Sequence, residues 1–170
     1  DNTVKLQVTD SVGSIGTKNW TINVVEFYLE STFDDTLVYN GEVTFRYTPY
    51  GNISKTINFT IDGKTLGSTT TAVTGRQMTY AIPAQIHGAH LVEVSMTAEI
   101  NGKQVTSNKI SKDIMWAIEG NSTPIISCAT KTAIAKQYSN VAINYTVYDP
   151  SSSTTTVTLE VDGVKNATLT

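Results

Sequence analysis

The stretch from Gly41 to Gly63, GEVTFRYTPYGNISKTINFTIDG, alternates apolar and polar residues in two successive runs. The apolar positions are Val43, Phe45 and Tyr47 in the first run and Ile57, Phe59 and Ile61 in the second. Successive side chains of a β-strand point to opposite sides, so this alternation is typical of a strand with one buried face. A polar turn with Pro49 and Gly51 separates the runs. The stretch therefore predicts two successive strands, each with one buried face.

The same pattern returns from Asn140 to Gly163, NVAINYTVYDPSSSTTTVTLEVDG. About 98 residues apart, the positions Tyr39, Val43, Phe45, Tyr47 and Tyr50 recur as Tyr138, Val141, Ile143, Tyr145 and Tyr148. The dipeptide Asp62-Gly63, which is favoured in tight hairpins because glycine accepts a positive φ, recurs 100 residues later as Asp162-Gly163. The chain therefore contains an internal repeat of two-strand units.

The first 25 residues predict one hairpin. The alternating runs are Val4, Leu6 and Val8 before a turn-like segment, and Trp20, Ile22 and Val24 after it. The first run matches Val92, Val94 and Met96 at a separation of 88 residues. Because two strands cannot bury a core alone, we expect this hairpin to be the last one of a preceding repeat.

Residues 26–118 predict a full set of seven or so short strands and no segment with a helical period. The expected strands cover residues 27–32, 41–48, 55–61, 64–73, 77–82, 90–99 and 104–116. Turn signals roughly every 8–12 residues are typical of a two-sheet sandwich. The threonine-rich segment from Lys64 to Val73 is expected at a sheet edge, where it could lie against a neighbouring copy.

One strand and its turn carry a family resemblance. His90-Leu91-Val92-Glu93-Val94, followed by Asn101-Gly102, resembles the late hairpin of bacterial and bacteriophage immunoglobulin-like repeats. In those repeats a G-x-H-x-V-x-V strand precedes a D/N-x-x-G turn, and Gly88-Ala89-His90 stands in the corresponding place. The segment from Val4 to Asp10 resembles the same hairpin. The resemblance implies the sandwich fold and a repeated, surface-displayed role, and it implies no activity.

The predicted fold class is all-β, with tandem immunoglobulin-like β-sandwich repeats, one complete and two partial. Residues 1–25 are expected to be the C-terminal hairpin of a preceding repeat, and residues 26–118 a complete sandwich. Residues 119–124, EGNSTP, predict a polar linker. Residues 119–170 are then expected to hold the N-terminal strands of a following repeat, with Cys128 in the place of Glu30.

Composition excludes several classes of function. Charged residues make up 16% of the chain, below the typical share of about 25%, and the net charge is −3. Lys and Arg are scattered singly, so no nucleic-acid partner is expected. No apolar run approaches the roughly 18 residues of a membrane span. The chain begins at Asp1 without a signal-peptide pattern, so we expect a segment of a longer protein.

The chemistry-bearing residues form no catalytic, cofactor-binding or metal-binding motif, so we expect no enzyme and no cofactor. His87 and His90 would point to different faces of a strand, and we expect His90 to support a strand start. The carboxylates near turns and junctions are Asp34, Asp35, Glu26 and Glu119. Calcium needs six to eight oxygens, so these isolated carboxylates favour solvated turns. The single cysteine, Cys128, is expected to be a buried small side chain.

Aromatic residues offer a second class of candidate. A sugar-stacking platform would draw on Trp20, Trp116, Tyr39, Tyr50, Tyr138 and Tyr148. Recurrence at equivalent positions favours a structural role instead, with Tyr47 and Tyr145 as core-facing tyrosines. Asn-x-Ser/Thr sequons occur at Asn19, Asn52, Asn58, Asn121, Asn144 and Asn166, and chance explains many of them in a chain this rich in Ser and Thr.

The leading functional hypothesis is a non-enzymatic structural or display protein of a bacteriophage virion, as a fibre, tail or head-decoration component. Stacked sandwiches on short linkers make a stiff spacer, and repeats without disulfides suit assembly in a reducing cytoplasm. The expected partners are other copies, other virion or surface proteins, and host-surface glycans. The alternatives are a bacterial cell-surface adhesin or spacer, and an accessory carbohydrate-binding module of a secreted enzyme.

Overall fold

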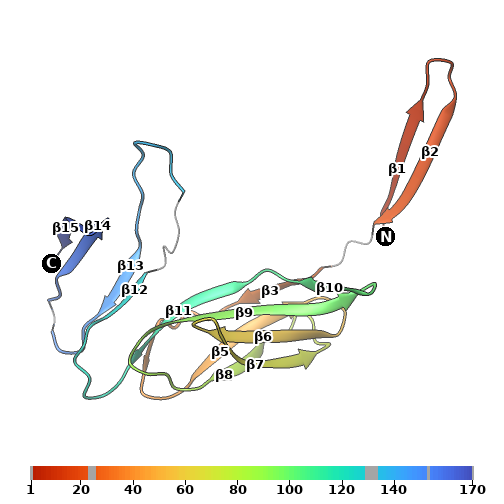
Figure 1. Cartoon of the computed structure of the whole chain (residues 1–170). Coiled ribbons are helices and arrows are strands. Elements are labelled where there is room, and N and C mark those ends of the chain that lie inside the picture. The colour runs from red at the N-terminus through yellow and green to blue at the C-terminus, as the bar shows by residue number, and fades with distance from the viewer. Residues whose placement is uncertain (1, 23–25, 129–133, 153, 170) are drawn as a thin grey trace.

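The computed structural model in Figure 1 describes residues 2–22, 26–128, 134–152 and 154–169. The regular structure in these ranges is made of strands alone, which confirms the all-β fold class. The strands are β1 (Asn2–Thr9), β2 (Ile15–Ile22), β3 (Tyr28–Ser31), β4 (Leu37–Tyr39), β5 (Val43–Tyr50), β6 (Lys55–Ile61), β7 (Lys64–Thr71), β8 (Met78–Ile82), β9 (Gly88–Ile100), β10 (Lys103–Thr106), β11 (Ile110–Ala117), β12 (Ile125–Cys128), β13 (Tyr145–Tyr148), β14 (Val157–Val161) and β15 (Val164–Leu169). None of the described residues belongs to a helix that could cross a lipid bilayer.

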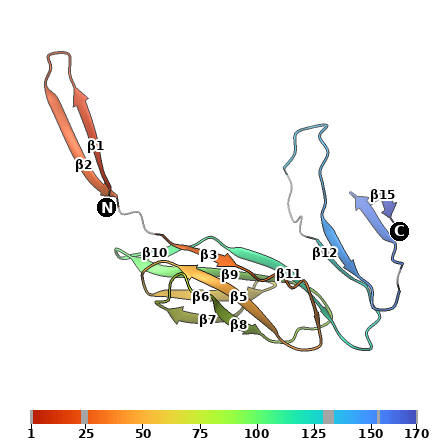
Figure 2. The same cartoon turned by 180° about the vertical axis from the view of Figure 1, so that it is seen from behind.

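Strands β3 to β11 form an immunoglobulin-like sandwich of two sheets. One sheet has the order β4-β11-β9-β6-β7, with β10 also paired to β9, and the other has the order β3-β5-β8. Strand β7 lies at an edge of the larger sheet, as the sequence predicts for residues 64–73. The inward faces of the sheets, which lie one over the other in Figures 1 and 2, meet in one apolar core. Its buried members are Leu29, Phe33, Val43, Phe45, Tyr47, Ile57, Phe59, Ile61, Ile82, Val92, Val94, Met96, Ile114 and Trp116.

Along β5 and β6, buried and less buried side chains alternate in step with the apolar and polar residues of the sequence. Phe45 and Phe59 are fully buried, while Thr44 and Arg46 between the apolar positions of β5 are exposed. The buried aromatic rings contact one another edge to face, with 5.4 Å between the ring centroids of Tyr47 and Phe59. These two strands, which belong to different sheets, thus supply the centre of the core from both sides.

Three hairpins turn on dipeptides in which both residues have positive φ. The φ angles are 49° and 76° at Asp62 and Gly63, 53° and 73° at Asn101 and Gly102, and 52° and 76° at Asp162 and Gly163. This conformation matches the right-handed twist of the flanking strands and requires Asn, Asp or Gly. The Asp-Gly and Asn-Gly dipeptides therefore predicted these turns correctly.

One expectation about the larger sheet is wrong, and one of its strands was not predicted. The expected single strand over residues 104–116 is two strands, β10 and β11. At the break, the side chains of Ser107 and Asn108 bond to backbone groups, and the N–H of Ser107 still donates to the carbonyl oxygen of Met96 at 2.9 Å. Ser107 Oγ accepts from Met96 N–H at 3.0 Å. Asn108 binds both backbone groups of Leu29, at 2.7 Å to its N–H and 2.9 Å to its C=O. Strand β4, which pairs in parallel with β11, was not expected.

The remaining strands form two-stranded sheets on either side of the sandwich. Strands β1 and β2 pair with each other, as do β12 with β13 and β14 with β15. In Figures 1 and 2 the β1–β2 hairpin lies at one end of the sandwich and β12 to β15 lie at the other. The division of the chain at residues 25 and 118 stays a prediction.

Candidate functional site

The strongest candidate site is the junction at which β12 leaves the sandwich. A small apolar cluster forms there from Met115 and Ala117 of β11 and Ile125 of β12, with Leu37 and Tyr148 packed against it. Only 3% of Ile125 is exposed. Met115 and Ala117 point away from the main core, because Ile114 and Trp116 of the same strand occupy the opposite, core-facing side. We call this group the junction cluster.

The backbone between β11 and β12 is held by two side chains of the sandwich. The N–H of Ile118 donates to His87 Nδ1 at 3.2 Å, and His87 Nε2 lies 2.8 Å from the carbonyl oxygen of Thr123. The N–H of Glu119 donates to Asn40 Oδ1 at 3.0 Å. His87 therefore connects Ile118, just before the predicted linker of residues 119–124, with Thr123 near its end, and this requires the tautomer with its proton on Nε2.

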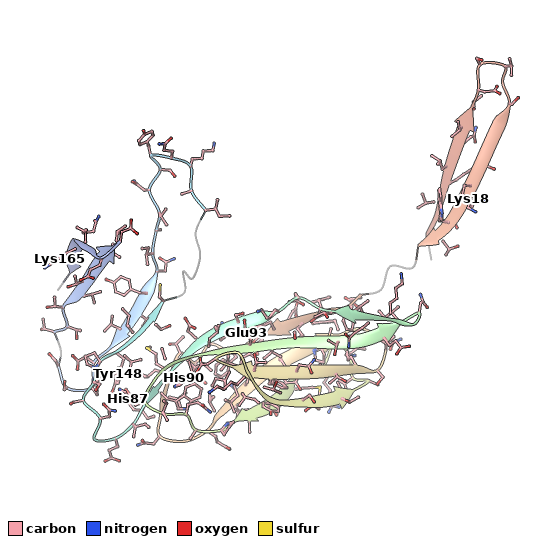
Figure 3. All side chains as sticks on the ribbon, viewed as in Figure 1. Lys18, His87, His90, Glu93, Tyr148 and Lys165 are labelled. Carbon is pink, nitrogen blue, oxygen red and sulfur yellow. The ribbon has the colours of Figure 1, made fainter. Side chains whose placement is uncertain are left out.

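Side chains of the sandwich and of the β12–β13 hairpin also contact each other directly. The ring of Tyr39 contacts that of Tyr148 edge to face, with 5.7 Å between centroids and an interplanar angle of 87°. The Tyr39 hydroxyl raises the pKa of Tyr148 through a side-chain hydrogen bond. Ser127 Oγ donates to Asp113 Oδ2 at 3.2 Å. Figure 3 shows Tyr148, His87 and His90 gathered at this end of the sandwich.

The two histidines have separate structural roles. His87 belongs to the junction, whereas His90 lies in the sandwich at the start of β9, as expected from the sequence. His90 Nδ1 lies 2.6 Å from Asp62 Oδ2, and its Nε2 lies 3.0 Å from the carbonyl oxygen of Ile86. The His90 ring also packs edge to face on Trp116, with 5.6 Å between centroids. Within the described residues, no three His, Cys, Asp or Glu side chains come together as a metal site.

Most of the carboxylates considered as calcium ligands lie apart from this junction, and the one within it makes its contact through its backbone N–H. Asp34 and Asp35 are exposed in the connection between β3 and β4, and Glu26 is exposed before β3. Glu119 lies in the linker, where its backbone N–H is the group that Asn40 binds.

The aromatic candidates for sugar stacking are divided between core and surface. Trp116 is buried, and its Nε1–H donates to the carbonyl oxygen of Gly41 at 3.1 Å. Trp20 is exposed on β2 and Tyr138 is almost fully exposed. Tyr50 stacks on Tyr28 with 4.4 Å between ring centroids, a pairing that the sequence pattern did not indicate.

Two burial predictions for residues 119–170 are wrong. Tyr47 is buried as predicted, but its counterpart Tyr145 is 39% exposed. Cys128 is half-buried, where a buried side chain was expected. Both residues lie in β12 and β13, which pair only with each other among the described strands, so they are not part of a larger sheet like that of Tyr47.

The sequons do not share a common environment. Asn58 is half-buried and donates from Nδ2 to Thr97 Oγ1 at 3.2 Å, so its amide already serves the sheet. Asn121 accepts from the N–H of Thr123 at 3.0 Å within the linker. Asn19, Asn52 and Asn166 are exposed. The distribution identifies no ligand surface.

No family model matches the chain, and a comparison with curated protein sequences gives no match either. Among solved structures, the chain is similar to one described as "Structures of Clostridium thermocellum CbhA fibronectin(III)-like modules". The sequence identity is 19% and the TM-score is 0.41, over 67% of this chain. The matched part spans 60% of the chain of that structure.

Proposed function

We propose that this chain is a segment of a non-enzymatic structural protein of a bacteriophage virion, a fibre, tail or head-decoration component built from immunoglobulin-like repeats. The observation that carries the proposal is the junction. A spacer needs connections that keep successive units in a defined orientation, and this connection has a buried apolar residue, Ile125, and a linker bonded near both ends by His87.

The pairing of strands supports a repeated architecture. In the sandwich, β3 pairs with β5 so that Ser31 lies opposite Tyr47. After the junction, β12 pairs with β13 so that Cys128 lies opposite Tyr145, the counterpart of Tyr47. Cys128 therefore takes the register position of Ser31, one residue from the Glu30 position expected from the sequence. A second unit that begins with the same antiparallel pair favours a row of similar sandwiches.

The junction explains how such a row would work without chemistry. Fully burying an isoleucine side chain contributes about 1.5–3 kcal/mol, and hydrogen bonds between the linker and the sandwich restrict its rotation. Each joint then transmits orientation from one unit to the next. The function of the chain is the distance and angle that it maintains between the parts of the particle at its two ends.

The location of the full-length protein tests this proposal. Antibodies against residues 26–118 should label purified phage particles by immunoelectron microscopy, and uninfected host cells should stay unlabelled. Label on the surface of uninfected cells would replace the virion role with an adhesin or spacer role. Tight binding of the chain to a defined oligosaccharide, measured by calorimetry, would instead favour a carbohydrate-binding module.

A further inference from the structure

His87 holds the linker through a ring that must be neutral. Its Nδ1 accepts from the N–H of Ile118 at 3.2 Å, and its Nε2–H donates to the carbonyl oxygen of Thr123 at 2.8 Å. A neutral imidazole has one donor nitrogen and one acceptor nitrogen, whereas the protonated ring has two donors. Only the neutral ring with its proton on Nε2 therefore satisfies both linker bonds.

A second proton on His87 opposes both contacts. A proton on Nδ1 would lie against the N–H of Ile118, so two donors would face each other and the backbone N–H would lose its acceptor. The two nitrogens belong to one rigid ring, so a rotation that moves Nδ1 away from Ile118 also moves Nε2 away from Thr123. Among the described residues, no carboxylate forms an ion pair with His87 that would hold the charged ring in place.

His90, three residues later, has the opposite arrangement. Its Nδ1 lies 2.6 Å from Asp62 Oδ2, and its Nε2 lies 3.0 Å from the carbonyl oxygen of Ile86. Both ring nitrogens face acceptors, so the protonated ring keeps both hydrogen bonds. A fall in pH therefore leaves the contacts of His90 within the sandwich in place, and the loss of hydrogen bonds is confined to the linker.

The other ionisable groups on the elements around His87 belong to classes that titrate at lower or higher pH. Histidine changes charge between about pH 5 and 8, whereas carboxyl, lysine and tyrosine side chains ordinarily titrate outside this range. The backbone N–H of Ser151 lowers the pKa of Asp149 further, and the hydrogen bond to Tyr39 raises the pKa of Tyr148. The charged groups on these elements are Glu42, Asp62, Lys64, Glu119 and Asp149.

Two other contacts of the junction do not involve His87. Asn40 Oδ1 accepts from the N–H of Glu119 at 3.0 Å, and Ile125 is buried in the junction cluster. These contacts keep the β12–β13 hairpin attached to the sandwich. Among the described hydrogen bonds, however, residues 120–124 have no other bond to a side chain of the sandwich. Loss of the His87 bonds therefore frees the linker while the hairpin stays attached.

We propose that His87 makes this junction a pH-dependent joint. With the ring neutral, the linker is bonded to the sandwich and the units keep one orientation. With the ring protonated, the linker is released and the strands that follow turn relative to the sandwich. The order of the joint is thus present at higher pH and is lost as the pH falls and His87 takes up a proton. The inference rests on the proposed spacer function, because a change of orientation matters where orientation is the function.

Nitrogen NMR of the whole chain tests both steps. The imidazole spectra should show His87 with its proton on Nε2 at pH 8 and with protons on both nitrogens at pH 5. Backbone order parameters of residues 120–123 should be about 0.85 at pH 8, as in a rigid strand, and below about 0.6 at pH 5, as in a flexible loop. The order parameters of β11 should be the same at both pH values.

Two variants separate His87 from other effects of pH. His87→Asn keeps a carbonyl oxygen close to the place of Nδ1 and carries no charge, so the order of the linker should be equal at pH 8 and pH 5. His87→Phe removes both linker bonds, so the linker should be flexible at both pH values. His87 lies outside the buried core, so the thermal transition of the sandwich serves as the check of folding for both variants.

Several results would overturn the proposal. They are an unaltered chain with equal linker order at pH 8 and pH 5, a proton on Nδ1 at pH 8, and an ordered linker in His87→Phe. A pH effect that persists in His87→Asn would assign the effect to another group. A linker that is ordered at both pH values would exclude the joint and leave the spacer function intact. A linker that is flexible at both would remove the physical basis of the spacer as well, so the two failures are distinguishable.

Discussion

The turn between β6 and β7 shows, at the scale of single residues, how one carboxylate ties a hairpin to the next strand. Asp62 Oδ1 accepts from the N–H of Leu91 at 2.9 Å, and Asp62 Oδ2 is paired with His90 Nδ1. Partial burial acts to raise the pKa of Asp62, but the hydrogen bonds from His90 and Leu91 outweigh it and lower the pKa below the ordinary value of 3.8. Folding therefore favours the ionised carboxylate.

This pKa predicts how stability depends on pH. A carboxyl group whose pKa is lower in the folded state contributes stability above pH 3.8, and the contribution is lost as the pH falls through the folded-state pKa. Asp62→Asn should destabilise the chain at neutral pH, by less than about 1 kcal/mol because the side chain is half-exposed. Urea unfolding from neutral to acidic pH should show the difference shrinking below pH 3.8. If the difference in unfolding free energy between the unaltered chain and Asp62→Asn stayed constant with pH, the lowered pKa of Asp62 would be contradicted. Asp162→Asn in the equivalent turn is the control.

A second residue-scale prediction concerns Asn108, whose amide binds both backbone groups of Leu29. Asn108→Ala removes two hydrogen bonds and leaves a partly buried N–H without its acceptor, which should cost about 1–3 kcal/mol. Chemical denaturation would measure this loss. Asn52→Ala, at an exposed position between β5 and β6, should change stability by less than about 0.5 kcal/mol. A similar loss of stability at both positions would mean that the two hydrogen bonds between Asn108 and Leu29 do not contribute.

At the scale of elements, the bulge between β6 and β7 is built around one glycine. A Cβ atom at Gly67 would lie 2.6 Å from the Tyr80 hydroxyl oxygen. Tyr80 is held in place because its ring stacks on Phe59, with 3.7 Å between centroids. The close approach of a tyrosine from the opposite sheet therefore requires glycine at this position.

Gly67→Ala should consequently destabilise the sandwich by about 1–3 kcal/mol, because Tyr80 must leave its stacked position. Thermal unfolding would give the size of the loss, and a smaller side chain at residue 80 should relieve it. Gly16→Ala is the matched control, since a Cβ there meets nothing within 4 Å in another strand. An unchanged midpoint for Gly67→Ala would show that the ring moves without cost.

The same elements show what could be predicted from the sequence. Strands β5 and β6 have one buried and one outward face, so their alternation was sufficient to place them. Strand β4 has three residues, too few for a period, and its pairing with β11 depends on contacts distant in sequence. At the break between β10 and β11, Ser107 and Asn108 form side-chain hydrogen bonds, which a hydrophobic pattern does not record.

The contacts between the sandwich and the strands that follow the linker appear only at the scale of the whole molecule. The polar composition of residues 119–124 predicted a linker, but it could not show that His87 and Asn40 bind that linker. His87 is 36 positions from Thr123 and Asn40 is 79 positions from Glu119, and nothing in the local sequence of either residue indicates these contacts. The burial of Ile125 was likewise hidden, because its partners Met115 and Ala117 lie on the outer side of β11.

The junction should therefore behave as a stiff joint, and spin labels on either side of it can measure its stiffness. With labels at Thr79→Cys and Thr158→Cys in a Cys128→Ser background, double electron–electron resonance should give one narrow distance distribution. Ile125→Ser, or His87→Ala combined with Asn40→Ala, should broaden it because the linker then rotates freely.

Gln85→Ala is the control for this measurement, since the Gln85 side chain bonds only locally, to the carbonyl oxygen of Pro83. A distribution in the unaltered chain as broad as that of the junction variants would show that the bonds and the buried isoleucine do not hold the orientation. In that case the chain would be a flexible tether, and a role that depends on fixed spacing would lose its physical basis.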